Sequence, residues 1–200
     1  LESLCLMESD IHNLNFLEAL PGLQSLDLVE CEGLEFIGSV VKLGDLRSLG
    51  FYECAGIQDI HVIGELAELK RLSLPSGTDQ KDFEAIIAAH PTLQVLELLY
   101  CENISDLSSL EGMTDLDVLT LGVEDIDLSS LNGLKQLELL ILEQDYFEDS
   151  LEIVALQQAL PDTRVVPGGT FCLGSGWLLL LIPMILIWVG LKRRRTIRGN

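Results

Sequence analysis

The sequence predicts an α/β solenoid: a parallel sheet with short 3₁₀ or helical returns, followed by one C-terminal transmembrane helix. Two observations lead to this prediction. A phrase of the form L-x-x-L-x-L-x-x-C, complete at Leu93–Cys101, recurs through residues 1–166 at intervals of 21 to 24 residues. A run of fifteen uncharged residues, 177–191, then leads directly into a basic block. Repetition at a period of ~20–50 residues is typical of solenoids, because each repeat needs its neighbours to bury its apolar face.

The phrase has three apolar positions, which are filled by leucine in every copy except for Phe51 in the third. Seven copies are present, and they open at Leu1, Leu23, Leu46, Leu69, Leu93, Leu116 and Leu137. The alternating L-x-L core predicts a short strand with its leucines on one face. Stacked at roughly 4.8 Å, such strands form a parallel sheet over a continuous leucine core.

The segments between the strands are mostly too short and too polar for a long helix, so we expect tight turns or single 3₁₀ turns. Residues 82–89 are an exception, because their apolar side chains recur at helical spacing, and Thr78 or Asp79 is placed to cap the helix start. A second helix is expected at Leu151–Leu160, and Thr163–Val166 is expected to form a final edge strand.

The phrase and its period resemble the leucine-rich repeat family. The return at 104–110 has the form I-x-D-L-S-x-L, and the return at 126–131 repeats it without the residue after the isoleucine. Both resemble the short returns of bacterial, internalin-like repeats. The resemblance implies a horseshoe with the sheet on its concave side. It also implies that Cys31, Cys54 and Cys101 are small buried fillers inside the turns. These cysteines lack the close C-x-x-C spacing of a zinc site.

The residues between the strand leucines face the concave side, because side chains alternate along a strand. In the last three repeats this face is apolar, and an exposed apolar patch can mark a protein-binding site. The predicted partner-binding residues are Val95, Leu99, Tyr100, Val118, Leu139 and Ile141, with Tyr52 as an outlying aromatic. The alternative is an idle face, or one covered by the helix at Leu151–Leu160.

Charge and motif content argue against several functions. The region before Pro167 holds all 32 acidic residues and only seven basic ones, a formal charge of −25, which repels nucleic acid and favours cationic partners. It shows no phosphate-binding loop, H-E-x-x-H or G-x-S-x-G. His12, His61 and His90 lie apart and are expected to face solvent or turns. The sequence therefore predicts no enzyme, catalytic residue, cofactor or metal site.

The C-terminal region predicts a membrane anchor. Residues 167–176 form a Gly-rich linker, 177–191 a transmembrane helix whose start extends back to 171, and 192–200 a basic tail. Counting from 171 provides the ~20 apolar residues that a bilayer requires. Pro183 is tolerated in a membrane helix, and Trp177 and Trp188 suit the interfaces. The basic residues Lys192, Arg193, Arg194 and Arg195 should remain cytoplasmic, which places the repeats outside, in the periplasm or at the cell surface.

The same tail also resembles bacterial C-terminal sorting signals. Gly168-Gly169 and the apolar run ending in arginines resemble the GlyGly-CTERM type, and Cys172 resembles the MYXO-CTERM type. This resemblance implies a processing protease as a further partner. A plain single-pass anchor explains the same residues, so both interpretations stay open.

Together these observations predict a membrane-anchored, extracytoplasmic module that binds a protein or surface ligand through its concave face. One alternative is a spacer or docking arm of a larger surface enzyme or sensor whose active part lies upstream of Leu1. Another is a structural adhesin stalk. Because the chain opens inside a repeat, we also expect a secretion signal and further repeats upstream.

Overall fold

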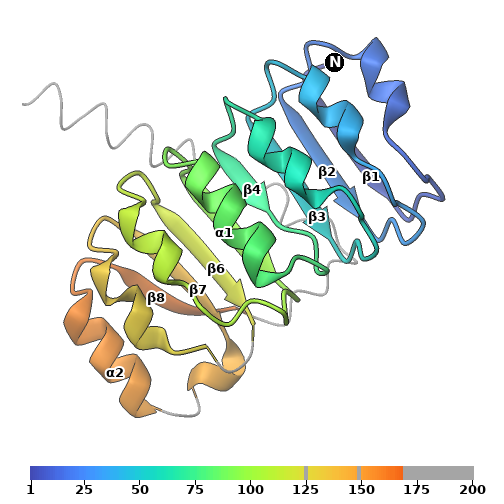
Figure 1. The fold of residues 1–200 in the computed structure, drawn as a ribbon. Coiled ribbons are helices and arrows are strands. Elements are labelled where there is room, and N and C mark those ends of the chain that lie inside the picture. The colour runs from blue at the N-terminus through green and yellow to red at the C-terminus, as the bar shows by residue number, and fades with distance from the viewer. Residues whose placement is uncertain (124–125, 148–149, 169–200) are drawn as a thin grey trace, which may run out of the picture. The chain divides into compact units, whose positions relative to one another are not determined.

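The computed structural model describes residues 1–123, 126–147 and 150–168. Its eight strands form one parallel sheet in the order of the sequence, and the returns lie along one face of this sheet (Figure 1). The strands are β1 (Ser3–Met7), β2 (Ser25–Val29), β3 (Ser48–Tyr52), β4 (Arg71–Ser73), β5 (Val95–Leu99), β6 (Val118–Gly122), β7 (Leu139–Glu143) and β8 (Arg164–Gly168). This arrangement confirms the predicted α/β solenoid with a parallel sheet.

The returns are 3₁₀ helices except at two places. They comprise η1 (Asn15–Ala19), η2 (Gly38–Lys42), η3 (Ile60–Glu65), η4 (Ser108–Gly112), η5 (Leu128–Gly133) and η6 (Gln144–Phe147). Two of the described returns are α-helical, α1 (Gln80–Ala89) and α2 (Ser150–Ala159). α1 lies where helical spacing predicted a helix, and α2 lies where the cap and stop residues predicted one. Asp79 caps α1 by accepting a hydrogen bond from the Asp82 backbone N–H at 2.8 Å.

The repeated leucines form the core between the sheet and the returns. The register pairs each leucine with its counterpart in the next repeat, as in Leu26↔Leu49 and Leu49↔Leu72. These side chains are fully buried from β2 to β7, whereas Leu4 and Leu6 on the edge strand β1 are only half-buried. Full burial of each leucine contributes roughly 1.5–3 kcal/mol, so the stack itself is the main source of stability.

Aspartate side chains at the starts of the returns accept hydrogen bonds from backbone N–H groups. Asp59 of the third repeat accepts hydrogen bonds from the backbone N–H groups of Ile37 and Gly38 in the second repeat, each at 2.9 Å. Asp106 and Asp127 accept hydrogen bonds from the backbone N–H groups two residues ahead, those of Ser108 and Ser129. Hydrogen bonds from the backbone and side chain of Ser108 lower the pKa of Asp106, and those from the side chain and backbone of Ser129 lower the pKa of Asp127. The Asp that precedes Leu-Ser therefore closes the turn at the start of each of these two short returns.

Two strands differ from the others or from their predicted limits. β4 is the shortest strand and ends at Ser73, because Pro75 has no N–H with which to continue the ladder. β8 runs to Gly168, so Pro167 and Gly168 extend the sheet two residues beyond the predicted end of the solenoid and are not linker. The structure places Leu142 opposite Pro167 and Glu143 opposite Gly168.

No helix in the described ranges is both long and apolar enough to cross a bilayer. The predicted transmembrane segment 177–191 lies outside the described residues, as do its flanking parts. The predicted membrane residues Trp177, Pro183, Trp188, Lys192, Arg193, Arg194 and Arg195 all belong to that part of the chain.

Candidate functional site

The candidate site is the concave face, by which we mean the face of the sheet that points away from the returns. Its side chains stand in rows because the strands are in register. One row runs Ser3, Ser25, Ser48, Arg71, Val95, Val118 and Leu139, and the next runs Cys5, Asp27, Gly50, Ser73, Glu97, Thr120 and Ile141. The first row thus changes from polar to apolar between β4 and β5.

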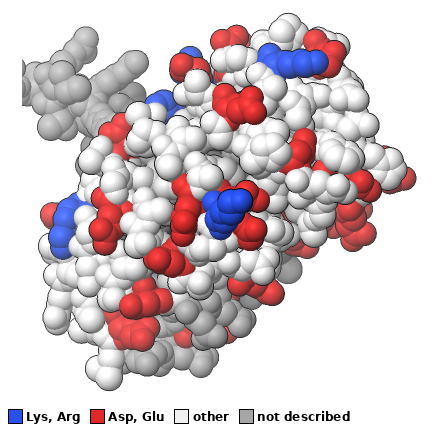
Figure 2. All heavy atoms as spheres, in the orientation of Figure 1, with Lys and Arg blue, Asp and Glu red and all other residues white. Residues whose placement is uncertain are grey.

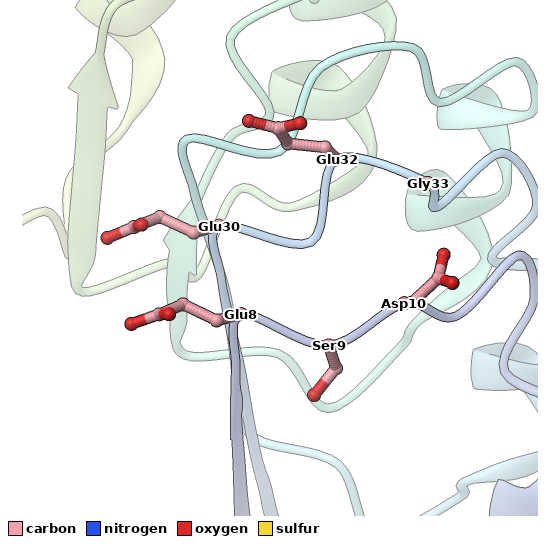
Figure 3. A pocket seen from close by; sticks show the side chains of 6 residues that line it. All are labelled: Glu8, Ser9, Asp10, Glu30, Glu32 and Gly33. Carbon is pink, nitrogen blue, oxygen red and sulfur yellow. The ribbon is translucent and has the colours of Figure 1, made fainter.

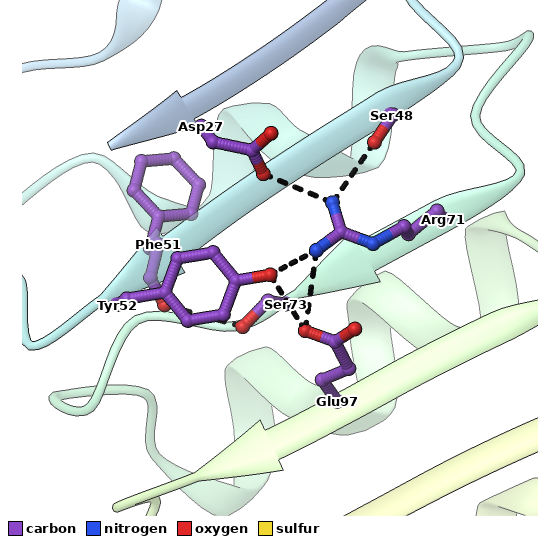
Figure 4. Close-up of polar contacts among 7 residues, drawn as sticks. All are labelled: Asp27, Ser48, Phe51, Tyr52, Arg71, Ser73 and Glu97. Carbon is purple, nitrogen blue, oxygen red and sulfur yellow. Dashed lines mark hydrogen bonds and ion pairs between the residues drawn. The ribbon is translucent and has the colours of Figure 1, made fainter. Parts of the chain in front are cut away.

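A connected group of polar side chains, the Arg71 cluster, spans β2 to β5 on this face (Figure 4). The guanidinium Nη1 donates to Asp27 Oδ1 at 3.0 Å and to Ser48 Oγ at 2.9 Å. Nη2 donates to the Tyr52 hydroxyl and lies 3.4 Å from Glu97 Oε2. The Tyr52 hydroxyl in turn donates to Glu97 Oε2 at 2.8 Å. One arginine therefore links three neighbouring strands to its own.

The charged side chains of the cluster are largely buried. The side chains of Arg71, Asp27 and Glu97 are 6%, 14% and 8% exposed. Burial alone would lower the pKa of Arg71, but the negative charges of Glu97 and Asp27 raise it above its ordinary value. Burial and the Glu97 charge raise the pKa of Tyr52, so its hydroxyl keeps its proton. The guanidinium stays charged and the phenol stays a donor.

Small residues beneath the cluster make room for it. A Cβ at Gly50 would lie 2.4 Å from Asp27 Oδ1 and 2.8 Å from the Tyr52 ring, closer than real Cβ atoms approach. Ser73, between Gly50 and Glu97 in the row, donates to the Phe51 carbonyl at 3.2 Å. The space above Gly50 and Ser73 therefore lets the side chains of Asp27 and Glu97 reach Arg71 from opposite sides.

Sequence reasoning placed each of these residues on the concave face but did not bring them together. The sequence did contain a sign of the cluster, because it predicts one basic residue on the concave side of the fourth strand and acidic residues on the second and fifth strands. Tyr52 was predicted as an outlying partner-binding residue. The structure places it within the cluster at 3% exposure, with its hydroxyl bonded to Glu97 on β5, so it is not an exposed aromatic.

The remaining predicted binding residues lie together on β5, β6 and β7. We call Val95, Leu99, Val118, Leu139 and Ile141 the apolar patch. Its members Leu99, Leu139 and Ile141 are half-buried, but Val95 and Val118 are only 3% and 8% exposed. The expectation that all five are exposed was therefore wrong for the two valines, because in-register neighbours on adjacent strands pack side by side.

Tyr100 follows β5 directly and is the exposed member of the predicted set. Its side chain is 46% exposed, and its backbone has a left-handed φ of 57°. Tyr100 N donates to the Gly122 carbonyl at 3.0 Å, so the backbone ladder continues one residue past the strand. The aromatic ring thus stands at the carboxyl edge of the apolar patch.

Acidic side chains gather at the carboxyl ends of β1 and β2. They line a hollow of about 330 Å³ formed by Glu8, Ser9, Asp10, Glu30, Glu32 and Gly33 (Figure 3). Acidic residues also outnumber basic ones on the face shown in Figure 2. Over the described ranges, no three His, Cys, Asp or Glu side chains are grouped so that they could hold a metal ion. The hollow is therefore an acidic surface.

The three cysteines predicted as buried fillers are buried and unpaired, which confirms that prediction. Their thiols donate to strand carbonyls, as Cys54 does to Tyr52 O at 3.4 Å. Burial raises the pKa of Cys54 to about 11 and that of Cys101 to about 12. Because the thiolate is the reactive form, these thiols are poor nucleophiles at neutral pH.

The three histidines were predicted to face solvent or turns, and they do so in different ways. His12 and His61 are exposed. His90 is only 4% exposed, and both of its ring nitrogens lie against backbone carbonyls. Sequence reasoning grouped His90 with the turn residues, because the pattern does not show that the end of α1 packs onto the preceding repeat.

The chain was compared with known proteins. No family model matches it, and no curated protein matches it. Among solved structures, it is similar to an internalin (inlF) from Listeria monocytogenes, with 21% identity, a TM-score of 0.50 and 83% of this chain covered. The chain has the leucine-rich repeat fold. This was the fold that the resemblance implied, and the likeness at this identity extends to the fold alone.

A leucine-rich repeat protein of Leptospira interrogans is also similar, with 18% identity, a TM-score of 0.44 and 84% of this chain covered. The chain spans about half the length of the two matched structures, 55% of the internalin and 54% of the Leptospira protein.

Proposed function

We propose that this chain is a non-enzymatic protein-interaction module, held at the outer side of a membrane, that binds a protein partner through the concave face of its leucine-rich repeats. The observation that carries the proposal is the apolar patch, set in register on three parallel strands. Val95 and Val118 form its floor, and the half-buried Leu99, Leu139 and Ile141 present the contact surface. Solenoids generally bind partners on such extended concave surfaces.

The charge of the solenoid supports a basic partner. Acidic residues far outnumber basic ones before Pro167. Two of the seven cations form ion pairs within the chain, Arg71 in its cluster and Lys42 with Glu18. A field of this sign accelerates the approach of cationic proteins and repels nucleic acid, although salt screens it over roughly 10 Å.

The binding proposal is tested by a double substitution in the patch, Leu139→Glu with Ile141→Glu. The matched control is Val41→Glu, which changes an apolar side chain that is 37% exposed on η2. Each full-length variant is crosslinked in the membranes of the source organism, and the attached proteins are identified by mass spectrometry. We expect proteins that attach to the wild type and to Val41→Glu but not to the double variant.

Circular dichroism of the same samples shows whether the double variant still folds. If all three proteins capture the same set while folded, the concave patch is not the binding surface. That result would favour a spacer arm or an adhesin stalk, neither of which needs this patch.

The anchoring proposal concerns residues 177–191, which lie outside the described part of the chain. It is supported by their uncharged sequence and by the basic block that follows. Intact mass spectrometry of the membrane fraction tests it. A mass that includes residues 192–200 indicates a simple single-pass anchor. A mass that ends near residues 168–177 indicates a sorting tail removed by a processing protease, and loss of the protein from membranes before any cleavage contradicts both.

A further inference from the structure

Phe36 lies at a position where other repeats have Asn or Asp. The position precedes the buried Leu or Ile at the start of each 3₁₀ return, and it holds Asn13, Asp106 and Asp127 in the first, fifth and sixth repeats. In these three repeats the side-chain oxygen accepts a hydrogen bond from the backbone N–H two residues ahead, at 3.1, 2.8 and 2.9 Å. Such a bond closes the turn that leads into the return. Phenylalanine has no acceptor and cannot make it.

The third repeat supplies the acceptor that Phe36 lacks. The N–H two residues after Phe36 belongs to Gly38, and it donates to Asp59 Oδ2 at 2.9 Å. The Ile37 N–H donates to the other oxygen, Asp59 Oδ1, also at 2.9 Å. A Cβ at Gly38 would lie 3.2 Å from Asp59 Oδ2, so the glycine gives this carboxylate room to reach the turn. The turn of the second repeat is therefore closed from outside the repeat, and position 36 is not needed for it.

The Phe36 ring does not serve the core either, because it is 48% exposed. Its backbone pairs with Asn13 of the first repeat, and Phe16, three residues after Asn13 on η1, is 42% exposed. The residues equivalent to Phe16 in the second, fifth and sixth repeats are serines, namely Ser39, Ser109 and Ser130. Two adjacent repeats thus each expose an aromatic ring where other repeats have a small polar residue. Departures from a local pattern that the core does not need are expected at functional positions.

The charges near these rings are negative. Glu32 and Glu35, in the segment that leads to the ring of the second repeat, are exposed. Within the described part of the chain, neither forms an ion pair, and Glu35 accepts a hydrogen bond from Gln58 Nε2 at 3.2 Å. Lys42, the one cation on η1 and η2, pairs with Glu18. A guanidinium fits such a surface, because one planar group can stack on an aromatic face and donate to carboxylates.

We propose that Phe16 and Phe36 form a second protein-binding surface, the aromatic surface, which takes an arginine-bearing segment of a partner protein. The guanidinium stacks on an exposed ring, and Glu32 and Glu35 supply the opposite charge. Lysine fits less well, because its ammonium is a compact, strongly hydrated charge without a planar face. The aromatic surface lies on the first two repeats, whereas the apolar patch lies on β5 to β7, so neither proposal depends on the other.

The first test asks whether the fold needs the ring. Phe36→Asn introduces the residue that the first repeat has at this position, and it leaves the formal charge unchanged. We expect the melting temperature of the full chain in detergent to stay within about 2 °C of the wild type, because the ring is exposed and Asp59 still accepts from Gly38. A fall of more than about 5 °C would show that the ring supports the fold, and it would overturn the proposal.

The second test measures binding of fluorescent oligo-arginine and oligo-lysine peptides of equal length to the same full-chain proteins, by anisotropy at about 150 mM salt. The control is Val154→Asn on α2, where the side chain is also 48% exposed. We expect the wild type and Val154→Asn to prefer oligo-arginine. Phe36→Asn and Phe16→Ser should each bind oligo-arginine about two- to five-fold more weakly, with oligo-lysine binding unchanged.

The comparison of the two peptides separates the rings from the general acidity of the chain. If Phe36→Asn binds oligo-arginine as tightly as the wild type, or loses oligo-lysine to the same extent, the surface attracts any cation and the proposal is overturned. The protein with Leu139→Glu and Ile141→Glu should keep the preference for arginine, because its changes lie on the apolar patch. Loss of the preference in that protein would place the arginine site on the concave face instead.

Discussion

The two halves of the concave face have the same strand backbone but present different side chains. On β2 to β5, Asp27, Arg71 and Glu97 turn toward one another and pair within the chain. On β5 to β7, the facing side chains are apolar, and Leu139 and Ile141 stay half-buried. In the first half the charged side chains pair within the chain, although Arg71 Nε is buried without a hydrogen-bond partner, whereas the second half presents apolar side chains. We therefore expect a partner to contact the apolar half of the face and not the polar half.

The largest effect is expected where both halves depend on the same core. Leu96→Asp places a charge at a position of 0% exposure beneath β5, and it should cost more than about 4 kcal/mol, enough to abolish cooperative folding. The matched control is Leu99→Asp on the concave side of the same strand, where the side chain is half-buried. Urea unfolding followed by circular dichroism measures both. A Leu96→Asp protein as stable as the control would contradict the leucine stack.

The second-largest loss of stability is expected in the polar half, when Arg71 is replaced. Arg71→Met leaves Asp27 and Glu97 buried without a counter-charge, and removal of one partner from a buried pair costs roughly 3–5 kcal/mol. The triple variant Arg71→Met, Asp27→Asn, Glu97→Gln removes the unpaired charges and should recover most of that loss. Urea unfolding midpoints of both proteins give the comparison. If the single and triple variants are equally unstable, the charges are not what holds this half together.

The fold could be predicted from the sequence, but the contacts between repeats could not. The leucine period, the polar short returns and the capped segment after Asp79 were sufficient for the fold, because they act through local periodicity and nearest-neighbour stacking. The Arg71 cluster was not foreseen, because Asp27 and Arg71 lie 44 residues apart and meet only through the register of three strands. The burial of Val95, Val118 and His90 was missed for a related reason, since packing between repeats is not written in the pattern of any single repeat.

A smaller effect compares one glycine in each half. Gly50→Ala would force Asp27 and Tyr52 apart, and overpacking of this kind costs roughly 1–3 kcal/mol. Gly122→Ala on β6 would meet Leu99 Cδ2 at 3.0 Å and Glu143 Oε1 at 3.1 Å, the ends of flexible side chains that can move. We therefore expect it to cost less than Gly50→Ala in thermal unfolding. The reverse order would mean that the cluster adapts more easily than the apolar half.

Hydroxyl-radical footprinting of the full chain tests the division of the concave face most directly. Side-chain labelling is compared between the purified protein and the protein in native membranes with its partners present. The account predicts that Leu99, Leu139 and Ile141 are labelled when purified and protected in membranes, whereas Met7, 44% exposed on β1, is labelled equally in both. Tyr52 should remain unlabelled in both states. Equal labelling of the apolar patch in both states, or protection of Met7 instead, would contradict it.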